Sequence, residues 1–356
     1  MYRNVSRRHV LRLGAAGAGV VAVGGFKLRF AAAQDGAPPL AQKESYRVAF
    51  AQVEENNPWR IAQTESMRSE AERLGHELIY SNAEGSEARQ IANVDQAIAQ
   101  RVDLIFLAPR SETPLAQAVL RAKQANIPVI CLDRDVDNEV ARVGQDYICF
   151  IGSDFVQEGA RAAEWLARTM NGEAQIIELQ GTTGSSPAID RGKGFADYLA
   201  GTYTPSAENP TAAATPAAPP SGGFPGMQII ASQTGDFARD EGRQVFETLY
   251  QANPNANAVY AHNDEMAIGA IQALEAQGRV PGQDLIIVSV DGSREALQNI
   301  IDGKLGATVE CNPRFGPIAF ETLARYAAGE EIAPRIINQD RFFDRSNAAE
   351  LIDEAY

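Results

Sequence analysis

Residues 47–81 read RVAFAQVEENNPWRIAQTESMRSEAERLGHELIYS, and this one stretch predicts the class of fold. The apolar run 47–52 is typical of a buried strand, and 77–81 is typical of a second one. Between them Asn57 can cap a helix that has Pro58 in its first position, and Gly75 can end that helix. Two strands joined by such a helix form a βαβ unit with parallel strands.

The same alternation continues along the chain and then starts again. The first series predicts further strands near 104–108, 128–132 and 148–152, with helices near 86–100 and 113–125. The second series predicts strands near 175–179, 227–231, 258–261, 285–290 and 307–310, with helices near 155–170, 187–199, 238–251, 265–276, 295–301 and 317–327. The end of the chain is poorly patterned. We therefore expect an α/β protein with two similar Rossmann-like lobes, each built on a parallel sheet covered by helices.

The first 33 residues indicate an export signal rather than part of the fold. Ser6-Arg7-Arg8-His9-Val10-Leu11-Arg12 resembles a twin-arginine signal, and Ala31-Ala32-Ala33 offers a cleavage site. The apolar stretch between them is shorter than the roughly 20 residues that a membrane-spanning helix needs. We expect residues 34–45 to be a linker and the mature protein to reach the periplasm or extracytoplasmic space. The alternative is a disordered basic tail.

Residues 203–226 (YTPSAENPTAAATPAAPPSGGFPG) interrupt the βαβ pattern. The prolines exclude a continuous helix, and the composition offers little apolar surface to bury. The alternation resumes on both sides of this segment. It is therefore interpreted as an insertion in the second lobe rather than as a boundary between domains.

Charge and cysteine content exclude several classes of protein. The net charge is −14 although the first 33 residues are basic, so the body of the protein would be repelled by nucleic acid. Cys131, Cys149 and Cys311 have no metal-ligand spacing, and the first two lie in apolar strands. We expect three buried thiols and neither a metal site nor a cofactor.

Polar and aromatic side chains follow several of the predicted strands. Asn57, Trp59 and Arg60 follow the first strand, and Asp133 and Arg134 follow the fourth. The second series adds Arg191, Phe237, Asn263 and Asp291. In open parallel sheets, ligands bind beyond the carboxyl ends of the strands. Carboxylates, guanidinium groups and amides can bond neighbouring hydroxyls, and an aromatic face can cover the C–H side of a ring, so the pattern favours a sugar.

The phrases that carry these residues resemble a known family. They are Asn57-Pro58-Trp59-Arg60, Leu132-Asp133-Arg134, Ala188-Ile189-Asp190-Arg191, Gly235-Asp236-Phe237, Ala261-His262-Asn263-Asp264 and Val290-Asp291-Gly292. In order and spacing they resemble the periplasmic sugar-binding proteins of the ribose/galactose type, most closely the galactofuranose-binding type. Arg60 is part of that likeness, since ribose-type relatives have an aromatic residue there.

The resemblance implies two lobes joined by three hinge strands that close over one monosaccharide. We expect the N-terminal lobe to span 46–152 and 311–337, and the C-terminal lobe to span 153–310 and 338–356. The implied ligand-binding residues are Asn57, Trp59, Arg60, Asp133, Arg134, Arg191, Phe237, Asn263, Asp291 and Glu310. Glu310 could instead bond within the hinge, and Asp264 is expected to cap the following helix rather than to bind sugar.

The resemblance also implies the function. We expect a monomeric substrate-binding component of a sugar ABC transporter, with no catalytic residue, that delivers a galactofuranose-like or other aldose to a membrane permease and its ATPase. A sugar sensor that feeds a chemoreceptor or histidine kinase is the main alternative, and no residue separates the two.

Three other classes fit the sequence less well. An exported NAD(P)-dependent sugar oxidoreductase needs a glycine-rich turn after the first strand, but residues 52–59 contain no glycine, and the match GAGVVA at 17–22 has no strand before it. A repressor needs a helix-turn-helix before the core. A glycoside hydrolase needs a carboxyl group with a raised pKa, whereas neighbouring arginines favour ionised carboxylates.

Overall fold

Two six-stranded sheets form the centre of the fold in the computed structural model, which describes residues 36–206 and 215–356. The first sheet has the order β11-β5-β4-β3-β1-β2 and the second has the order β12-β10-β9-β8-β6-β7. The strands of the first sheet are β1 (Arg47–Gln52), β2 (Glu77–Asn82), β3 (Leu104–Leu107), β4 (Val129–Leu132), β5 (Phe150–Gly152) and β11 (Arg335–Ile337). Those of the second are β6 (Glu173–Gln180), β7 (Gly226–Thr234), β8 (Ala258–Ala261), β9 (Ile286–Asp291), β10 (Ala307–Glu310) and β12 (Phe342–Asp344).

The two sheets repeat one topology, as the alternation in the sequence predicted. The order β2-β1-β3-β4-β5 in the first sheet matches β7-β6-β8-β9-β10 in the second, and these pairs are parallel. In such a sheet the chain reverses its direction of winding beside the first strand, and the carboxyl ends of the strands there form a crevice suited to a ligand.

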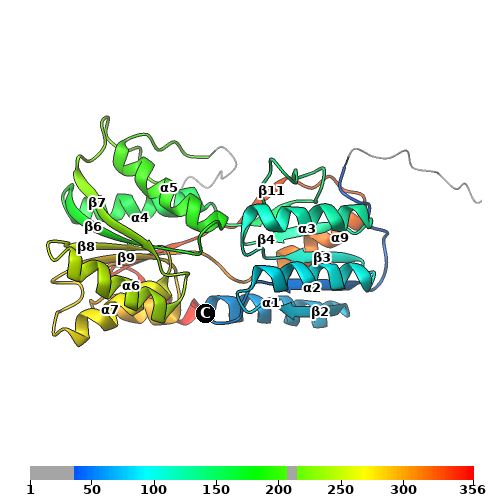
Figure 1. Cartoon of the computed structure of the whole chain (residues 1–356), viewed down its shortest axis with the longest axis horizontal. Coiled ribbons are helices and arrows are strands. Elements are labelled where there is room, and N and C mark those ends of the chain that lie inside the picture. Colours follow the sequence, from blue (N-terminus) through cyan, green and yellow to red (C-terminus); the bar gives the residue numbers. More distant parts are fainter. Residues whose placement is uncertain (1–35, 207–214) are drawn as a thin grey trace, which may run out of the picture. The chain divides into compact units, whose positions relative to one another are not determined.

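Helices cover both sheets in pairs (Figure 1). In the first lobe α1 (Pro58–Leu74) packs on α9 (Gly316–Ala327), and α2 (Glu87–Ala99) packs on α3 (Glu112–Gln124). In the second lobe α4 (Phe155–Thr169) packs on α5 (Ser186–Ala200), and α6 (Arg239–Ala252) packs on α7 (Asp264–Ala276). The remaining helical segments are α8 (Arg294–Ile301), α10 (Ala348–Leu351) and the 3₁₀ helix η1 (Ile352–Glu354).

Local signals place the ends of these helices. The side chain of Asn57 accepts a hydrogen bond from the backbone N–H of Arg60, and Pro58 occupies the first position of α1. Gly75 ends that helix with φ at 72°, a left-handed conformation that glycine adopts without a steric penalty. The start and stop predicted from the sequence are therefore confirmed.

The end of the chain, which showed little pattern in the sequence, supplies one edge strand to each sheet. β11 pairs in parallel with β5, and β12 pairs antiparallel with β10. Each has three residues, too few to show a periodicity. Among the described residues the chain passes between the two sheets three times, after β5, after β10 and between β11 and β12. The lobe boundaries given above stay a prediction.

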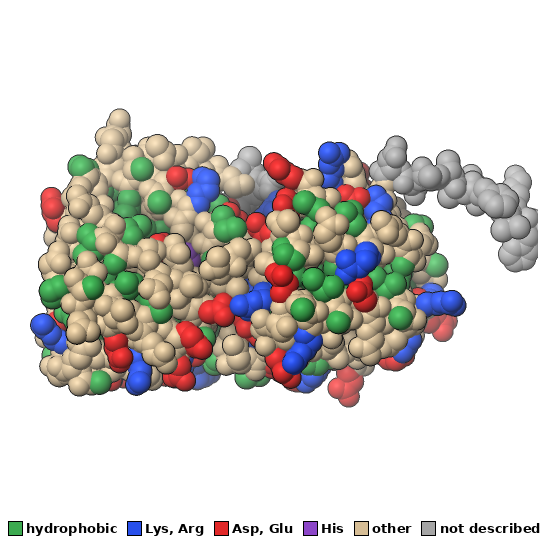
Figure 2. All heavy atoms as spheres, viewed as in Figure 1, with side chains coloured by type: hydrophobic (Ala, Val, Ile, Leu, Met, Phe, Trp, Pro, Cys, Tyr) green, Lys and Arg blue, Asp and Glu red, His purple; other side chains and the backbone are tan. Residues whose placement is uncertain are grey.

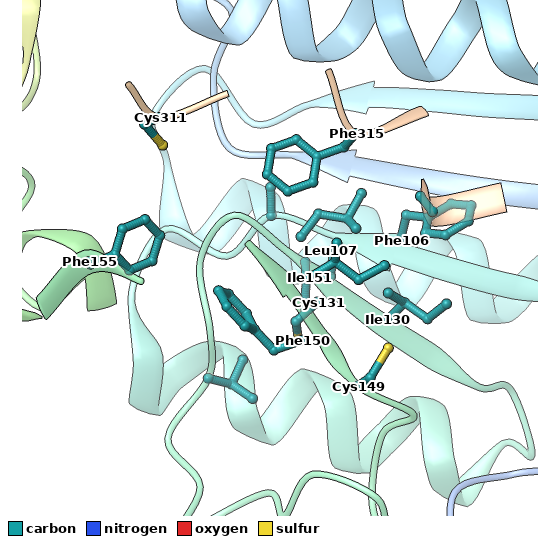
Figure 3. Packing of buried hydrophobic residues seen from close by; sticks show 14 of the residues in the cluster. Phe106, Leu107, Ile130, Cys131, Cys149, Phe150, Ile151, Phe155, Cys311 and Phe315 are labelled. Atoms are coloured by element: carbon teal, nitrogen blue, oxygen red, sulfur yellow. The ribbon is translucent and has the colours of Figure 1, made fainter. Parts of the chain in front are cut away.

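Buried aromatic and aliphatic side chains fill the first lobe around its sheet (Figure 3). Cys131 and Cys149 lie within this packing, whereas Cys311 lies on the passage that follows β10. All three cysteines are buried and free, which confirms the predicted thiols. Burial raises the pKa of the Cys311 thiol well above its ordinary value, so this group stays protonated at neutral pH.

Acidic and basic side chains are scattered and interspersed over the face shown in Figure 2. Among residues 36–206 and 215–356, no helix has the length and apolar character that a membrane span would require. The predicted export signal at residues 1–33 lies outside the described residues, as do residues 207–214 of the predicted insertion. The described parts of that insertion, 203–206 and 215–225, contain no helix or strand.

Candidate functional site

One pocket gathers nine of the ten residues that the sequence predicted as ligand contacts. The pocket is narrow, with about 30 Å³ of free space between its side chains. Its lining comes from both lobes and comprises Asn57, Trp59, Arg60, Asp133, Arg134, Pro187, Arg191, Phe237, Asn263, Asp291 and Cys311. Pro187 and Cys311 were not predicted, and Glu310 is not part of the lining.

The start of α1 supplies three lining residues, namely the cap residue Asn57 and, in the first turn, Trp59 and Arg60. Hydrogen bonds and an ion pair hold their side chains in place. The Trp59 indole N–H donates to the backbone oxygen of Cys311 at 2.7 Å, which ties the ring to the passage after β10. Arg60 stands over that ring, with its guanidinium carbon 4.7 Å from the centroid. One edge of the Arg60 guanidinium meets Asp133, with Nη2 and Oδ2 2.7 Å apart. The first turn of α1 therefore presents an aromatic ring and a guanidinium group together.

Asp133 and Arg134 follow β4 directly, and their backbone is constrained. Asp133 has φ at 64°, a left-handed conformation that is uncommon for a residue other than glycine. Arg134 is 1% exposed, and its Nη1 donates to the backbone oxygen of Arg110 at 3.3 Å. Burial and the nearby Arg60 lower the pKa of Arg134 to about 10, so it stays a cation at neutral pH.

Arg191 is the corresponding cation of the second lobe and comes from α5. Its Nε donates to Glu158 Oε2 and its Nη1 donates to the backbone oxygen of His262, both at 2.7 Å. Its Nη2 lies 3.8 Å from Asp291 Oδ1. Burial opposes the charge of Arg191, but the carboxylates raise its pKa well above its ordinary value. The guanidinium thus has partners in α4, in the residue that follows β8, and in β9.

Phe237 and Asn263 complete the part of the pocket lining that comes from the second lobe. Phe237 has φ at 59°, and the cations Arg134 and Arg191 lie 5.4 and 5.7 Å from its ring centroid. The Asn263 side-chain oxygen caps α7 by accepting from Met266 N, and its amide nitrogen donates to the backbone oxygen of Phe237 at 3.0 Å. An amide nitrogen has two N–H donors, so one donor of Asn263 is left to face the pocket.

Asp291 ends β9 and is buried among charged groups. Burial raises the pKa of Asp291 well above its ordinary value, and Arg191 opposes that rise. Asp133 and Asp291 offer acceptors, while Arg60, Arg134 and Arg191 offer donors. Such a pocket can satisfy several hydroxyl groups of one small polar molecule at once. No group of His, Cys, Asp and Glu among the described residues is arranged to hold a metal ion.

Comparison with known proteins identifies the family. The model of the periplasmic binding protein domain family matches residues 48–331, which is most of the chain. This chain belongs to the periplasmic binding protein family. The resemblance inferred from the sequence and the type I fold with two lobes are thereby confirmed.

The names of three relatives of this periplasmic binding protein each include a sugar in its furanose form. The galactofuranose-binding protein of Escherichia coli is 36% identical over 283 residues, 78% of this chain and 81% of that protein. A Mycobacterium smegmatis structure in complex with β-D-fucofuranose is 37% identical with a TM-score of 0.77, covering 86% of this chain and 94% of that one. The third is the binding protein of the arabinose ABC transporter from Shewanella sp. ANA-3, bound to α- and β-L-arabinofuranose. It is 34% identical with a TM-score of 0.75, and the match covers 86% of this chain and 95% of that one.

Two expectations about this periplasmic binding protein need correction. Glu310 accepts hydrogen bonds from Nε and Nη2 of Arg341, at 2.9 and 2.8 Å, so its carboxylate is engaged at the passage between lobes rather than in the pocket. Asp264 does not cap α7, because Asn263 does. The Asp264 carboxylate instead accepts from Ser289, Ser293 and Thr308, and so ties α7 to β9 and β10.

Sequence reasoning missed the acids that stand behind the pocket. Glu54 follows β1 in the same strand-end segment as Asn57, so its position was a usable signal. Glu158 lies in the first turn of α4, where an acidic side chain commonly interacts favourably with the helix dipole. Its position in the sequence therefore gave no sign of a role at the pocket. Only the packing of α4 on α5 brings Glu158 to Arg191.

Proposed function

We propose that this chain captures a monosaccharide in its five-membered ring form and serves as the substrate-binding component of a sugar ABC transporter. The observation that carries the proposal is that nine residues predicted to bind sugar, from two lobes, line one pocket. A membrane permease with its ATPase is the proposed partner. The proposed place of work is the periplasm or extracytoplasmic space, with the protein exported by the predicted twin-arginine signal and acting as a monomer.

Each lining group has a role that its chemistry supports. Asp133 and Asp291 would accept from hydroxyls, Arg60, Arg134 and Arg191 would donate to hydroxyl or ring oxygens, and Asn57 and Asn263 would contribute amides. Trp59 and Phe237 would cover the C–H faces of the ring. Glu310 is left out of this set and is proposed as a residue of the hinge.

The sugars named for the three relatives above share one stereochemical configuration. D-Galactose, D-fucose and L-arabinose share their configuration at carbons 2 to 4 and differ only in what carbon 5 carries: CH₂OH, CH₃ or H. We therefore propose an aldose of this configuration, in furanose form, as the ligand. This narrows the galactofuranose-like aldose expected from the sequence to one stereochemical series.

Lobe closure would couple binding to transport. A ligand that touches both lobes stabilises the arrangement that brings them together, by its differential affinity for that arrangement. The hinge would be the three passages after β5, after β10 and between β11 and β12. The resulting two-lobed surface would be the one presented to the permease.

Titration of the full chain with D-galactose, D-fucose and L-arabinose tests the proposal. A ligand at 100 times its Kd adds about 2.7 kcal/mol of stability, which a thermal-shift assay detects readily. We expect at least one of the three sugars to stabilise the protein, and expect Asp133→Ala and Arg191→Ala to abolish the shift.

Lys193→Ala is the matched control for Arg191→Ala. Lys193 lies on the same helix, its side chain is 59% exposed and it pairs with Asp197 on the surface. This variant should keep the shift. If none of the three sugars stabilises the wild-type protein, the proposed function is wrong.

A further inference from the structure

We propose that Glu54 and Glu158, which lie behind the pocket wall and outside its lining, are specificity-determining positioning residues that make the site reject anionic sugars. The inference rests on the proposed function, since it concerns discrimination among sugars. Neither glutamate is among the residues predicted from the sequence. Both are buried, with 3% and 2% of their surface exposed.

The lining by itself has an excess of positive charge. It holds the guanidinium groups of Arg60, Arg134 and Arg191 against the carboxyl groups of Asp133 and Asp291. With all five ionised, the lining carries one net positive charge, which would attract a sugar carboxylate or phosphate. Protonation of the buried Asp291 would increase this excess.

The two glutamates reverse that excess, because each lies nearer to its arginine than the neighbouring carboxylate of the lining does. Glu158 Oε2 accepts from Arg191 Nε at 2.7 Å, and Glu54 Oε1 lies 3.7 Å from Arg134 Nη2. The third cation, Arg60, has its own lining partner in Asp133. Every pocket arginine thus has a carboxylate partner, and the seven groups together carry one net negative charge when all are ionised.

Burial strengthens the effect of these charges on a ligand, because buried charges are screened little by solvent. The side chains of both ion pairs are 2–4% exposed, so water and salt screen them little. Burial raises the pKa of Glu158, and the adjacent Arg191 opposes that rise without reversing it. An anionic ligand would have to enter a site in which the positive groups are already compensated, so it would gain little and face two further carboxylates.

The two pairs differ in a way that sharpens the test. The Glu54–Arg134 contact is too long for a hydrogen bond, and Glu54 Oε1 has no hydrogen-bond partner among the described residues. Glu54→Gln therefore removes charge with little loss of bonding to Arg134. Glu158→Gln removes the same charge but also replaces a short charge-assisted bond, so it tests positioning as well.

The probes are D-galactose, D-fucose, L-arabinose and D-galacturonate, because D-galacturonate differs from the other three only in bearing a carboxylate on carbon 5. The readout is the ratio of the Kd for D-galacturonate to the Kd for the neutral sugar that binds best, measured by calorimetry on the full chain. We expect a ratio above 100 in the wild-type protein. Glu54→Gln and Glu158→Gln should each lower it by tenfold or more.

Charge-preserving and surface variants serve as controls. Glu54→Asp and Glu158→Asp should keep the ratio within threefold of the wild type even if overall affinity falls. Glu164→Gln makes the same chemical change elsewhere on α4, where Glu164 pairs with Arg168 outside the pocket, and should leave both the ratio and the affinity unchanged.

The outcomes separate this inference from the proposed function. A wild-type protein that binds none of the neutral sugars overturns the proposed function. A wild-type protein that binds a neutral sugar and D-galacturonate with similar affinity overturns the inference alone. So does an unchanged ratio in Glu54→Gln, or in Glu158→Gln if Glu54→Gln does not fold.

Discussion

Phe237 shows how much of the pocket depends on the backbone of single residues. Its left-handed conformation costs on the order of 1 kcal/mol for a residue with a side chain, and the surrounding bonds must hold it. The Asn263 amide provides one such bond, to the Phe237 backbone oxygen. Gly181 provides the space, since a Cβ there would lie 1.9 Å from the Phe237 ring. The position of the Phe237 ring therefore depends on a glycine that lies outside the pocket lining.

Gly181→Ala should displace the Phe237 ring and weaken sugar binding by tenfold or more. The same change should lower the free energy of unfolding by about 1–3 kcal/mol, as overpacking of a core does. Calorimetric titration and thermal unfolding measure the two effects. Gly192→Ala is the control, because a Cβ there meets its nearest atoms at 3.5 Å, an ordinary contact. Unaltered binding in Gly181→Ala would contradict this account of the wall.

At the scale of helices and strands, the same side chains both end an element and face the pocket. Asn57 caps α1 and Asn263 caps α7, so each amide oxygen is committed to a helix while its nitrogen remains a donor. Because both cap residues line the pocket, α1 and α7 each begin at its edge. Helix capping and pocket lining are thus combined in one residue, and substitutions can separate the two roles.

Substitutions at Asn57 should separate capping from binding. Serine caps helices about as well as asparagine, so Asn57→Ser should keep the free energy of unfolding, whereas Asn57→Ala should lower it by about 1 kcal/mol. Both variants lack the amide donor and should bind sugar less tightly. Chemical denaturation and titration measure these effects. Equal stability of the serine and alanine variants would show that the cap contributes nothing.

At the scale of the whole described fold, the two lobes also meet through acidic residues. A second cavity is lined by Glu112 and Asp135 from one lobe and by Ser186 and Asp190 from the other, with Arg335 beside them. Backbone N–H groups cross between lobes here, from Glu112 to the Gly184 oxygen and from Asp135 to the Ser186 hydroxyl. Carboxyl groups of both lobes are therefore held close together.

This arrangement predicts a pH dependence of stability. Burial, together with Asp190, Asp135 and Asp137, raises the pKa of Glu112 to about 7, and burial raises that of Asp190 to about 6. A carboxyl group whose pKa is raised by folding binds its proton more tightly when folded. The free energy of unfolding should thus fall as the pH rises from about 4.5 to about 7.

Glu112→Gln should reduce this slope, because the uncharged amide replaces the group with the higher pKa. Denaturant unfolding at a series of pH values, in the wild type and the variant, provides the measurement. The same slope in both proteins would show that Glu112 does not contribute to the dependence.

Much of this fold is a consequence of local sequence. Apolar periodicity, Asn57, Pro58 and Gly75 determine where a strand ends and a helix begins, because these effects act within a few residues. Since parallel strands place their carboxyl ends at one edge of a sheet, the polar residues after β1, β4 and β9 could be predicted to face a ligand. Nine lining residues followed from this reasoning and from the family resemblance.

Only the tertiary structure decided which charges meet. Glu310 pairs with Arg341, 31 residues away, and Glu158 pairs with Arg191, 33 residues away on a different helix. Such long-range ionic partners are chosen by packing and carry no local pattern. Three-residue strands such as β11 and β12 form because a neighbouring strand offers its backbone. The sequence alone determined most of the helices and strands and the edge of the sheets at which the pocket lies, because those depend on near neighbours. The charge of the pocket depends on distant ones.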